Sequence, residues 1–457
     1  MDRQEERNQY LTELMDNLFF DPWREGEEDR KSLEWQVTYD CNLNCKYCYV
    51  NRHGDDLYKE DIRNKDDVIK NTKLLLNWIE SQGLQIPRWE IFSGSLFSQE
   101  IGHNVIRLMY QKLSNTNKKK ILPDTITVPT NMTFLMDKDI TIKVEELIHK
   151  FHDLGIRLHL SSSVEGKYME QNRPINHHLK TGPNMGEHLF EPQERGEEYY
   201  DKFFKFTKKY NYGFHPMIYS DDIEAWKKNF LWYQGKMSEY DIPHHKLFLL
   251  EVRNQEWSDR EVQEFREFVT FIHDWVYQNI ADGNKEKFFE LIKDSETINM
   301  IYGLIGSSKG KGMPCSIQSD VQVRLGDLHF GPCHRTSYKG LEFGKFKENG
   351  NMITGIEAIN PEMAMAVYGL DHETLQGCQT CPIRPICNKT CLGANIEDTG
   401  EIFSPNPKAC QLGHAKVLGA LDFYKNHNMF NMVKGHSNDR IFRAYNKLDK
   451  IANGEGA

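Results

Sequence analysis

The stretch that decides the fold of this chain reads Trp35-Gln36-Val37-Thr38-Tyr39-Asp40-Cys41-Asn42-Leu43-Asn44-Cys45-Lys46-Tyr47-Cys48. The apolar and polar alternation at its start predicts a short β-strand, and three cysteines follow at the spacing C-x3-C-x2-C. Three thiolates so close in sequence can hold three corners of one 4Fe–4S cube. No further cysteine follows before Cys315, so one coordination position stays open, as in sites that perform chemistry. A zinc site completed by His53 and a chance clustering of cysteines are the alternatives.

The composition indicates a globular protein with a substantial core. Hydrophobic residues make up 39% and aromatic residues 12% of the 457 residues, enough for about two or three domains. The 57 basic and 67 acidic side chains give a net charge of −10, which argues against a nucleic-acid partner. The charged N-terminus predicts no signal peptide, and no apolar run reaches the ~18 residues of a membrane span. We therefore expect a cytoplasmic protein with no membrane partner.

The ten cysteines fall into two groups, with none between them. The first group is the loop after the predicted strand. The second group comprises Cys315, Cys333, Cys378, Cys381, Cys387, Cys391 and Cys410. Clustered thiols in a cytosolic chain indicate metal ligands rather than disulfides, whereas structural cysteines of a core would be scattered along the chain.

Short apolar strands alternate with amphipathic helices through the first two thirds of the chain. The strands are expected at 89–92, 125–128, 156–163, 213–219 and 247–252. The helices are expected at 68–81, 104–113, 144–154, 199–210, 223–232 and 258–278, the last of them opened by a capping box of Ser258 and Glu261. Repeated strand–helix units require a mostly parallel sheet. They predict an α/β fold with a partial (β/α)6 barrel of the TIM type, whose active site lies at the carboxyl ends of the strands.

The organisation of the chain is expected to have four parts. They are an N-terminal helical extension at 1–30, the barrel at 31–306, a cysteine-rich iron–sulfur domain at 313–430 and a helical tail at 431–457. The Ser- and Gly-rich segment 307–312 is the best boundary between barrel and cysteine-rich domain. The short segments and turn residues after it predict a domain held together by metal rather than by a large apolar core.

The loop from Cys41 to Cys48, with aromatic Tyr47 before the last cysteine, resembles the cluster loop of the radical S-adenosylmethionine (radical SAM) enzymes. In that family SAM chelates the free iron and is cleaved reductively to a 5′-deoxyadenosyl radical, which abstracts hydrogen from carbon. The resemblance implies that Cys41, Cys45 and Cys48 form the catalytic centre by holding a 4Fe–4S cluster, with SAM as the second cofactor.

Further stretches are similar to the SAM pocket of the family. The turn Phe92-Ser93-Gly94-Ser95 stands where the family has a Gly-Gly-Glu turn, with one glycine kept and no Glu directly after it. The turn from Ser161 to Gly166 resembles the Ser-x-Asp-Gly turn, with Glu165 where Asp is usual. A hydroxyl and a guanidinium suit the SAM carboxylate. The resemblance implies cofactor contacts for Tyr47, Ser93, Gly94, Asn131, Ser163 and Arg173; ordinary turn and loop roles are the alternative.

The spacing Cys378-x2-Cys381-x5-Cys387-x3-Cys391, followed by Cys410, resembles the SPASM extension, which binds two auxiliary 4Fe–4S clusters. By the family pattern, one cluster is held by Cys378, Cys381, Cys387 and Cys410. The other is held by Cys315, Cys333 and Cys391, and its fourth corner is left to a substrate group or to Asp320, His329 or His334. A zinc ribbon in the Cys378–Cys391 core is the alternative.

Together the two resemblances cover about residues 35–415. They imply a radical SAM enzyme with three 4Fe–4S clusters that matures a ribosomally made peptide by forming a carbon–carbon or thioether cross-link. A reductase or flavodoxin-type protein would be the electron donor. One alternative is an anaerobic sulfatase maturase, which makes formylglycine. A second alternative, from another class, is a non-catalytic iron–sulfur protein that transfers electrons.

Overall fold

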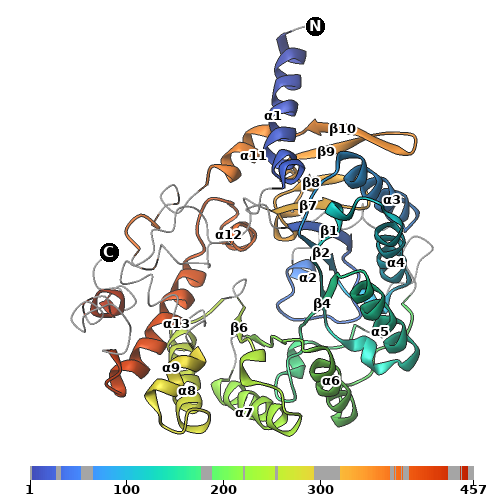
Figure 1. Cartoon of the computed structure of the whole chain (residues 1–457). Coiled ribbons are helices and arrows are strands. Elements are labelled where there is room, and N and C mark those ends of the chain that lie inside the picture. The colour runs from blue at the N-terminus through green and yellow to red at the C-terminus, as the bar shows by residue number, and fades with distance from the viewer. Residues whose placement is uncertain are drawn as a thin grey trace. The chain divides into compact units, whose positions relative to one another are not determined.

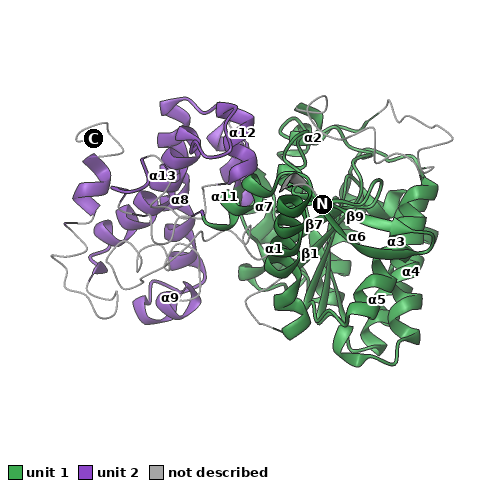
Figure 2. Cartoon of the chain, turned by 90° about the horizontal axis from the view of Figure 1, so that it is seen from above, with its two compact units in different colours: residues 1–217, 231–250, 316–369 green, residues 218–230, 251–315, 370–457 purple. Residues whose placement is uncertain are grey.

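The computed structural model describes residues 3–26, 32–52, 65–176, 188–219, 222–252, 256–292, 320–370, 375, 377–381, 383, 391–430, 443 and 445–450. The chain forms two compact units (Figure 2). The first comprises residues 1–217, 231–250 and 316–369, and the second comprises residues 218–230, 251–315 and 370–457. The four-part organisation stays a prediction, and its boundary segment 307–312 lies outside the described residues.

A series of parallel strands forms the centre of the first unit (Figure 1). The strands β1 (Ser32–Thr38), β2 (Arg88–Ser93), β3 (Thr125–Thr130) and β4 (Arg157–Ser162) are neighbours in this order. Parallel bridges from Ser162 to Phe214 and from Phe214 to Leu247 continue the series. They lead toward β5 (Met217–Ile218) and β6 (Leu250–Glu251), which pair with each other. The predicted α/β partial (β/α)6 barrel is confirmed.

The fifth and sixth strands are shorter than predicted. Hydrogen bonds of the parallel type run from Phe248 N–H to the Phe214 carbonyl at 2.9 Å and from Leu250 N–H to the Pro216 carbonyl at 3.3 Å. Pro216 itself has no N–H to donate, so it interrupts the ladder within the segment predicted as one strand.

Amphipathic helices connect the strands, as the periodicity predicts. They are α3 (Lys65–Gln82), α4 (Glu100–Asn115), α5 (Lys138–Asp153), α6 (Glu197–Tyr210) and α7 (Ile223–Glu239). Each of α3 to α6 buries its apolar stripe, as Leu75 and Ile79 do on α3. The helix α8 (Asp259–Asn279) begins with the predicted capping box, in which Ser258 and Glu261 satisfy each other's backbone N–H.

Four further strands extend the sheet on the other side of β1. The strand β7 (Asp320–Arg324) runs parallel to β1, and β8 (His329–Gly331), β9 (Gly344–Asn349) and β10 (Met352–Ala358) follow as antiparallel neighbours. The helix α11 (Pro361–Tyr368) comes after β10. Buried aromatic rings pack on one face of these strands, so an apolar core lies within the segment that the sequence predicts to be held by metal. The metal itself stays a prediction.

The N-terminal helix supplies much of that packing. The helix α1 (Arg3–Glu25) is longer than the short helix that the sequence predicts. Phe20 is fully buried, and its ring centroid lies 5.1 Å from that of Trp78 on α3 and 5.7 Å from that of Phe346 on β9. The first half of α1 is mostly exposed and extends beyond the sheet (Figure 1).

The second unit is built around two long helices, α8 and α13 (Pro407–Asn426), together with α9 (Lys285–Ile292) and α12 (Leu392–Thr399). A Cβ atom on Gly419 of α13 would lie 2.4 Å from the carbonyl oxygen of Arg266 on α8, so only glycine permits this close crossing. The Arg266 guanidinium donates to Asp422 at 2.6 Å and to Asp449 at 2.7 Å. In the described part of the chain, no helix is long and apolar enough to cross a membrane.

The packing of α1 predicts the effect of shortening its buried side chains. Phe20→Ala removes a fully buried ring and should lower the free energy of unfolding by about 3–5 kcal/mol, because the cavity collapses only in part. Tyr10→Ala on the same helix removes a ring that is 64% exposed and should change it by less than about 0.5 kcal/mol. Urea unfolding followed by circular dichroism measures both; equal effects would contradict the packing described.

Candidate functional site

The cysteine loop lies between β1 and the short helix α2 (Tyr49–Arg52), at the carboxyl end of a central parallel strand. As whole residues, Cys41, Cys45 and Cys48 are half-buried. Burial, followed by the neighbouring thiol of Cys45, raises the pKa of Cys41 well above its usual value. Burial also raises the pKa of Cys45 to about 11, although the charge of Arg173 opposes the rise. The three sulfurs are therefore close enough to act on one another electrostatically.

The three thiols of the loop could hold three corners of an iron–sulfur cluster. Among the residues that the structure describes, no three side chains of His, Cys, Asp or Glu converge to hold one ion. A 4Fe–4S cube takes one thiolate at each of its irons, so its ligands stand further apart than those of one ion. His53, the fourth ligand of the alternative zinc site, lies outside the described residues.

The segment 172–176 holds the backbone of the cysteine loop. The N–H of Asn44 donates to the Pro174 carbonyl at 2.8 Å, and the N–H of Lys46 donates to the Asn172 carbonyl at 3.0 Å. The Asn176 side chain donates to the carbonyl of Cys41 at 3.1 Å. These bonds fix the path of the loop independently of its thiols.

A buried hydrogen-bond network fixes the aromatic residue of the loop. The Tyr47 hydroxyl donates to Oε1 of Glu165, and the Arg173 guanidinium donates to the same oxygen through Nε at 2.6 Å. The Glu165 side chain is fully buried and that of Arg173 is 8% exposed. Burial and the charge of Glu165, opposed by Arg173, raise the pKa of Tyr47 well above its usual value. The hydroxyl therefore stays protonated and keeps donating.

Two of the predicted SAM-pocket residues, Tyr47 and Arg173, thus have partners within the chain. The second oxygen of Glu165 accepts from the N–H of Met217 at 2.9 Å, so the carboxylate joins the loop, the turn after β4 and the start of β5. The structure brings Tyr47 and Arg173 together, with the Arg173 guanidinium carbon 5.5 Å from the ring centroid. Their contacts with a cofactor stay predictions.

The turn after β2 approaches the cysteine loop very closely. A Cβ atom on Gly94 would lie 2.2 Å from the carbonyl oxygen of Asp40 and 2.6 Å from that of Tyr39. The N–H of Gly94 donates to the Thr38 carbonyl at 2.9 Å, and the N–H of Ser95 donates to the Asp40 carbonyl at 3.0 Å. Only glycine fits this position, because any side chain would collide with backbone atoms of the cysteine loop.

The predicted residue Asn131 lies directly against the loop. Its amide nitrogen donates to the Asn42 side chain at 2.9 Å and lies 3.7 Å from the sulfur of Cys41. Its amide oxygen accepts from the hydroxyl of Thr133 at 2.8 Å. Asn131 therefore orients the first cysteine, a role that the sequence alone did not indicate.

The predicted residue Ser163 has a histidine partner that the sequence reasoning missed. The Ser163 hydroxyl lies 2.7 Å from Nε2 of His215, at the carboxyl ends of two neighbouring barrel strands. Burial, followed by the charge of Arg173, lowers the pKa of His215 to about 4, so this ring is neutral at pH 7. A neutral ring can either donate to the hydroxyl or accept from it. His215 lies in the segment 213–219 that the sequence predicts as a strand, and this position could have indicated it as a site residue.

The second cysteine group is described in part. Cys333 belongs to the first unit, and Cys378, Cys381, Cys391 and Cys410 belong to the second. Cys315 and Cys387 lie outside the described residues. In the second unit, the sulfur of Cys381 lies 3.4 Å from Nε2 of His414, which is one helical turn after Cys410 on α13. Burial lowers the pKa of His414 to about 4. The sequence reasoning also missed this histidine.

His329 and His334, two of the predicted candidates for a fourth auxiliary ligand, have other partners. His329 lies 3.1 Å from a carboxylate oxygen of Asp327. Both the N–H and the ring of His334 contact Glu34, and its ring stacks on Phe92 at a centroid distance of 3.5 Å. Asp320 is buried on β7.

Comparisons with known proteins identify the fold. No protein-family model and no curated protein matches the chain. A solved structure of histidine-tagged anSMEcpe with bound AdoMet, which is SAM, matches 91% of this chain and 98% of its own, with 14% identity and a TM-score of 0.54. Native anSMEcpe with bound AdoMet matches at 15% identity and a TM-score of 0.50, over 93% and 99% of the two chains. The chain has their fold. The predicted resemblance is confirmed at the level of the fold; anSMEcpe is an anaerobic sulfatase maturase.

Streptococcus suis SuiB is a third similar structure. Bound to its precursor peptide SuiA, it matches 83% of this chain and 76% of its own at 12% identity, with a TM-score of 0.45.

The close approach at Gly94 predicts a strong effect of one added methyl group. Gly94→Ala should push the cysteine loop away and lower the free energy of unfolding by about 1–3 kcal/mol, because the contact is with backbone atoms that cannot rotate aside. Gly235→Ala, where the added Cβ meets nothing within 4 Å on α7, should instead raise it by about 1 kcal/mol. Urea unfolding compares the two variants, and a Gly94→Ala variant as stable as the parent would contradict the geometry.

The buried network predicts a second effect on stability. Glu165→Gln leaves the Arg173 charge buried without its carboxylate and should cost about 3–5 kcal/mol of the free energy of unfolding. The matched control is Glu146→Gln, which breaks an exposed ion pair with Lys150 and should cost less than about 1 kcal/mol. Similar urea midpoints for the two variants would show that Glu165 and Arg173 are not paired as described.

Proposed function

We propose that the chain is a radical SAM enzyme that modifies a peptide or protein substrate. The observation that carries the proposal is the three-cysteine loop at the carboxyl end of β1, in a chain with the fold of two AdoMet-bound structures. Active sites of barrels of this kind lie at that end of the strands. When bound, a 4Fe–4S cluster supplies the electron that cleaves SAM to a 5′-deoxyadenosyl radical.

The residues of the chain would have the following roles in the proposed enzyme. Cys41, Cys45 and Cys48 would hold three irons of the cluster. Asn131 orients Cys41 through its amide, while Tyr47 is held by Glu165 and Arg173. Ser93, Gly94 and Ser163 would line the SAM site, and the ring of His215 keeps the Ser163 hydroxyl in place.

We further propose two auxiliary 4Fe–4S clusters of the SPASM type. The ligands would be Cys378, Cys381, Cys387 and Cys410 for one, and Cys315, Cys333 and Cys391 for the other. The arrangement in four parts proposed from the sequence, a cytoplasmic location and a flavodoxin-type electron donor belong to the same proposal. They rest on the cysteine spacing and on the resemblance that this spacing carries.

The reaction that we propose is a carbon–carbon or thioether cross-link in a ribosomally made peptide. An anaerobic sulfatase maturase is the second candidate, favoured by the match to anSMEcpe over nearly the whole of both chains. Two complete 4Fe–4S cubes take eight cysteine ligands, and the chain has seven cysteines after the loop. The missing ligand disfavours the sulfatase maturase, for which we expect the complete set, and so favours the cross-link. Mass spectrometry of a co-expressed substrate separates the two: a cross-link removes two hydrogens and joins residues, whereas formylglycine forms at a single Cys or Ser.

The proposal predicts how iron content and SAM cleavage depend on Cys41. The reconstituted parent should hold about 12 irons per chain and form 5′-deoxyadenosine from SAM under reductant. Cys41→Ala should lose about four irons and abolish 5′-deoxyadenosine, because one corner of the loop cluster loses its thiolate. Iron analysis and liquid chromatography measure both quantities. A parent that forms no 5′-deoxyadenosine would refute the catalytic proposal, and about four irons together with zinc would refute the auxiliary clusters.

A further inference from the structure

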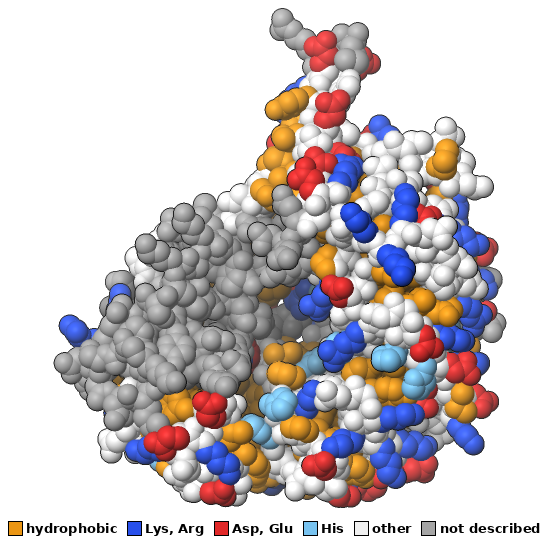
Figure 3. Space-filling view, viewed as in Figure 1, with side chains coloured by type: hydrophobic (Ala, Val, Ile, Leu, Met, Phe, Trp, Pro, Cys, Tyr) orange, Lys and Arg blue, Asp and Glu red, His pale blue; other side chains and the backbone are white. Residues whose placement is uncertain are grey.

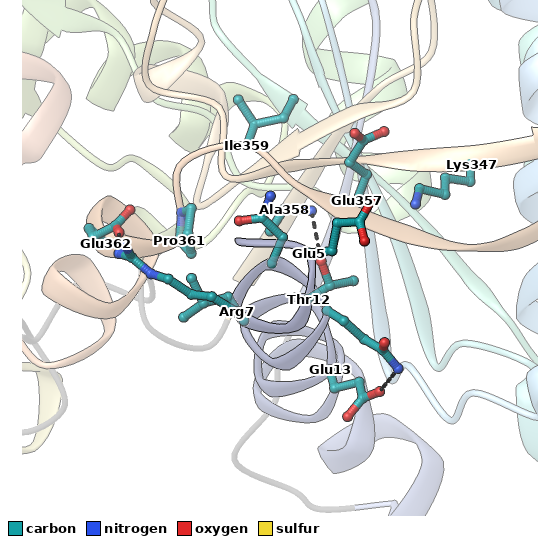
Figure 4. Close-up of a pocket in the computed structure, with 13 residues that line it drawn as sticks. Glu5, Arg7, Thr12, Glu13, Lys347, Glu357, Ala358, Ile359, Pro361 and Glu362 are labelled. Carbon is teal, nitrogen blue, oxygen red and sulfur yellow. Dashed lines mark hydrogen bonds and ion pairs between the residues drawn. The ribbon is translucent and has the colours of Figure 1, made fainter. Parts of the chain in front are cut away.

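The groove between α1 and the end of β10 in the first unit is bridged by contacts within the chain (Figure 4). Arg7 pairs with Glu362 at 2.9 Å, and the N–H of Ala358 donates to the hydroxyl of Thr12 at 3.4 Å. Acidic and basic side chains are interspersed on the part of the first unit that Figure 3 shows. The cysteines of the second unit differ from this groove, because one of their sulfurs lies against a histidine ring.

A histidine of α13 brings two separate cysteine segments of the second unit to one place. The sulfur of Cys381 lies 3.4 Å from Nε2 of His414, a distance that suits an N–H···S hydrogen bond. Cys410 lies one helical turn before His414 on α13, so the two side chains share a face, with about 5–6 Å between their Cβ atoms. The N–H of Cys381 donates to the Cys378 carbonyl at 3.1 Å, which closes a tight turn between these two cysteines. The turn and the start of α13 therefore meet at His414.

The close contact between Cys381 and His414 limits what the histidine can do at this site. In the part of the chain that the structure describes, no three side chains of His, Cys, Asp or Glu converge on one ion. A 4Fe–4S cube takes one ligand at each iron, so its ligands stand apart from one another. Two groups in direct contact cannot both be ligands of the cube, and the thiolate is the one that iron–sulfur clusters select. His414 is then left to bond the sulfur of Cys381 rather than an iron.

A hydrogen bond from the histidine would act on the electronic state of the cluster. An imidazole ring donates from Nε2 when its hydrogen is on that nitrogen and also when the ring is charged, and a thiolate bound to iron has no hydrogen to give in return. Donation withdraws electron density from the sulfur and so stabilises the reduced, more negative cluster. His414 is half-buried, and a hydrogen bond away from water is stronger than one in water.

We propose that His414 donates a hydrogen bond to the Cys381 thiolate and thereby raises the reduction potential of the auxiliary cluster to which Cys381 belongs. This inference rests on the auxiliary clusters of the proposed function. His414 acts through the sulfur, so it is a positioning residue and not a catalytic one. With the bond in place, the cluster accepts an electron more readily than the same cluster without it.

Potentiometric titration of the reconstituted full-length chain, followed by electron paramagnetic resonance, tests the proposal. The signal that Cys41→Ala removes belongs to the loop cluster, which leaves the auxiliary signals to be compared. His414→Phe and the smaller His414→Leu remove the donor, so one auxiliary cluster should shift to a lower midpoint potential. His414→Gln carries an amide N–H in place of Nε2 and should return the midpoint most of the way to that of the parent.

The matched control is His427→Gln. His427 lies at the end of the same helix, about 20 Å from His414 along the axis, and its Nε2 lies 2.6 Å from Asp274. This variant should leave the midpoint potentials of all clusters unchanged. Circular dichroism and iron analysis of each variant show whether the fold and the clusters are kept.

Two results would overturn this proposal alone. The first is an unchanged midpoint potential in a His414→Phe or His414→Leu variant that is folded and keeps its iron. The second is the loss of about four irons from all three folded His414 variants, because His414 would then hold the cluster itself. A parent chain without auxiliary iron would overturn the auxiliary clusters and this proposal together, so iron analysis of the parent distinguishes the two failures.

Discussion

A single buried carboxylate ties the cysteine loop to the barrel. Glu165 accepts from Tyr47 of the loop, from Arg173 after the β4 turn and from the backbone of Met217 at the start of β5. A fully buried carboxylate without partners would cost several kcal/mol, so the three segments are stable only when assembled together. Because Tyr47 lies between Cys45 and Cys48 in sequence, this assembly also places the thiols.

Contacts with the rest of the chain organise the cysteine loop. Its backbone bonds to the segment 172–176, and its first residues close on the turn at Gly94 with no room for a side chain. In a zinc finger, by contrast, metal binding supplies the folding free energy, and the apo form is unfolded. In the proposed enzyme, a loop built in this way would keep its path even with an incomplete set of cluster ligands, because its backbone bonds do not depend on the thiols.

The sequence predicts those parts of the fold that depend on local periodicity. Apolar alternation locates β1 to β4, the helical stripes locate α3 to α8, and Ser258 with Glu261 marks the start of α8. The rule for parallel strands then places Cys41 at the active-site end of the barrel. Periodicity carries no information about which distant segments pair with each other. The pairing of β7 with β1 joins residues almost three hundred positions apart, and nothing in either segment specifies the other.

The same limit applies to the site. The cysteines can be recognised from the sequence because clustered thiols have few roles other than metal binding. His215 and His414, in contrast, are single histidines whose partners come from other strands or turns. Glu165 stands where the Ser-x-Asp-Gly turn has Asp, and the structure pairs it with Tyr47 and Arg173. Its longer side chain reaches both of them, so the departure is compensated within the structure.

The carboxyl ends of the parallel strands bring together turns that are far apart in the sequence. The cysteine loop follows β1, the turn at Gly94 follows β2, Asn131 follows β3 and Ser163 follows β4. Because these four strands are neighbours in the sheet, the turns lie next to one another in the same order. In the proposed enzyme, selectivity for the reacting residue would then arise at this end of the barrel, from the side chains that the turns carry.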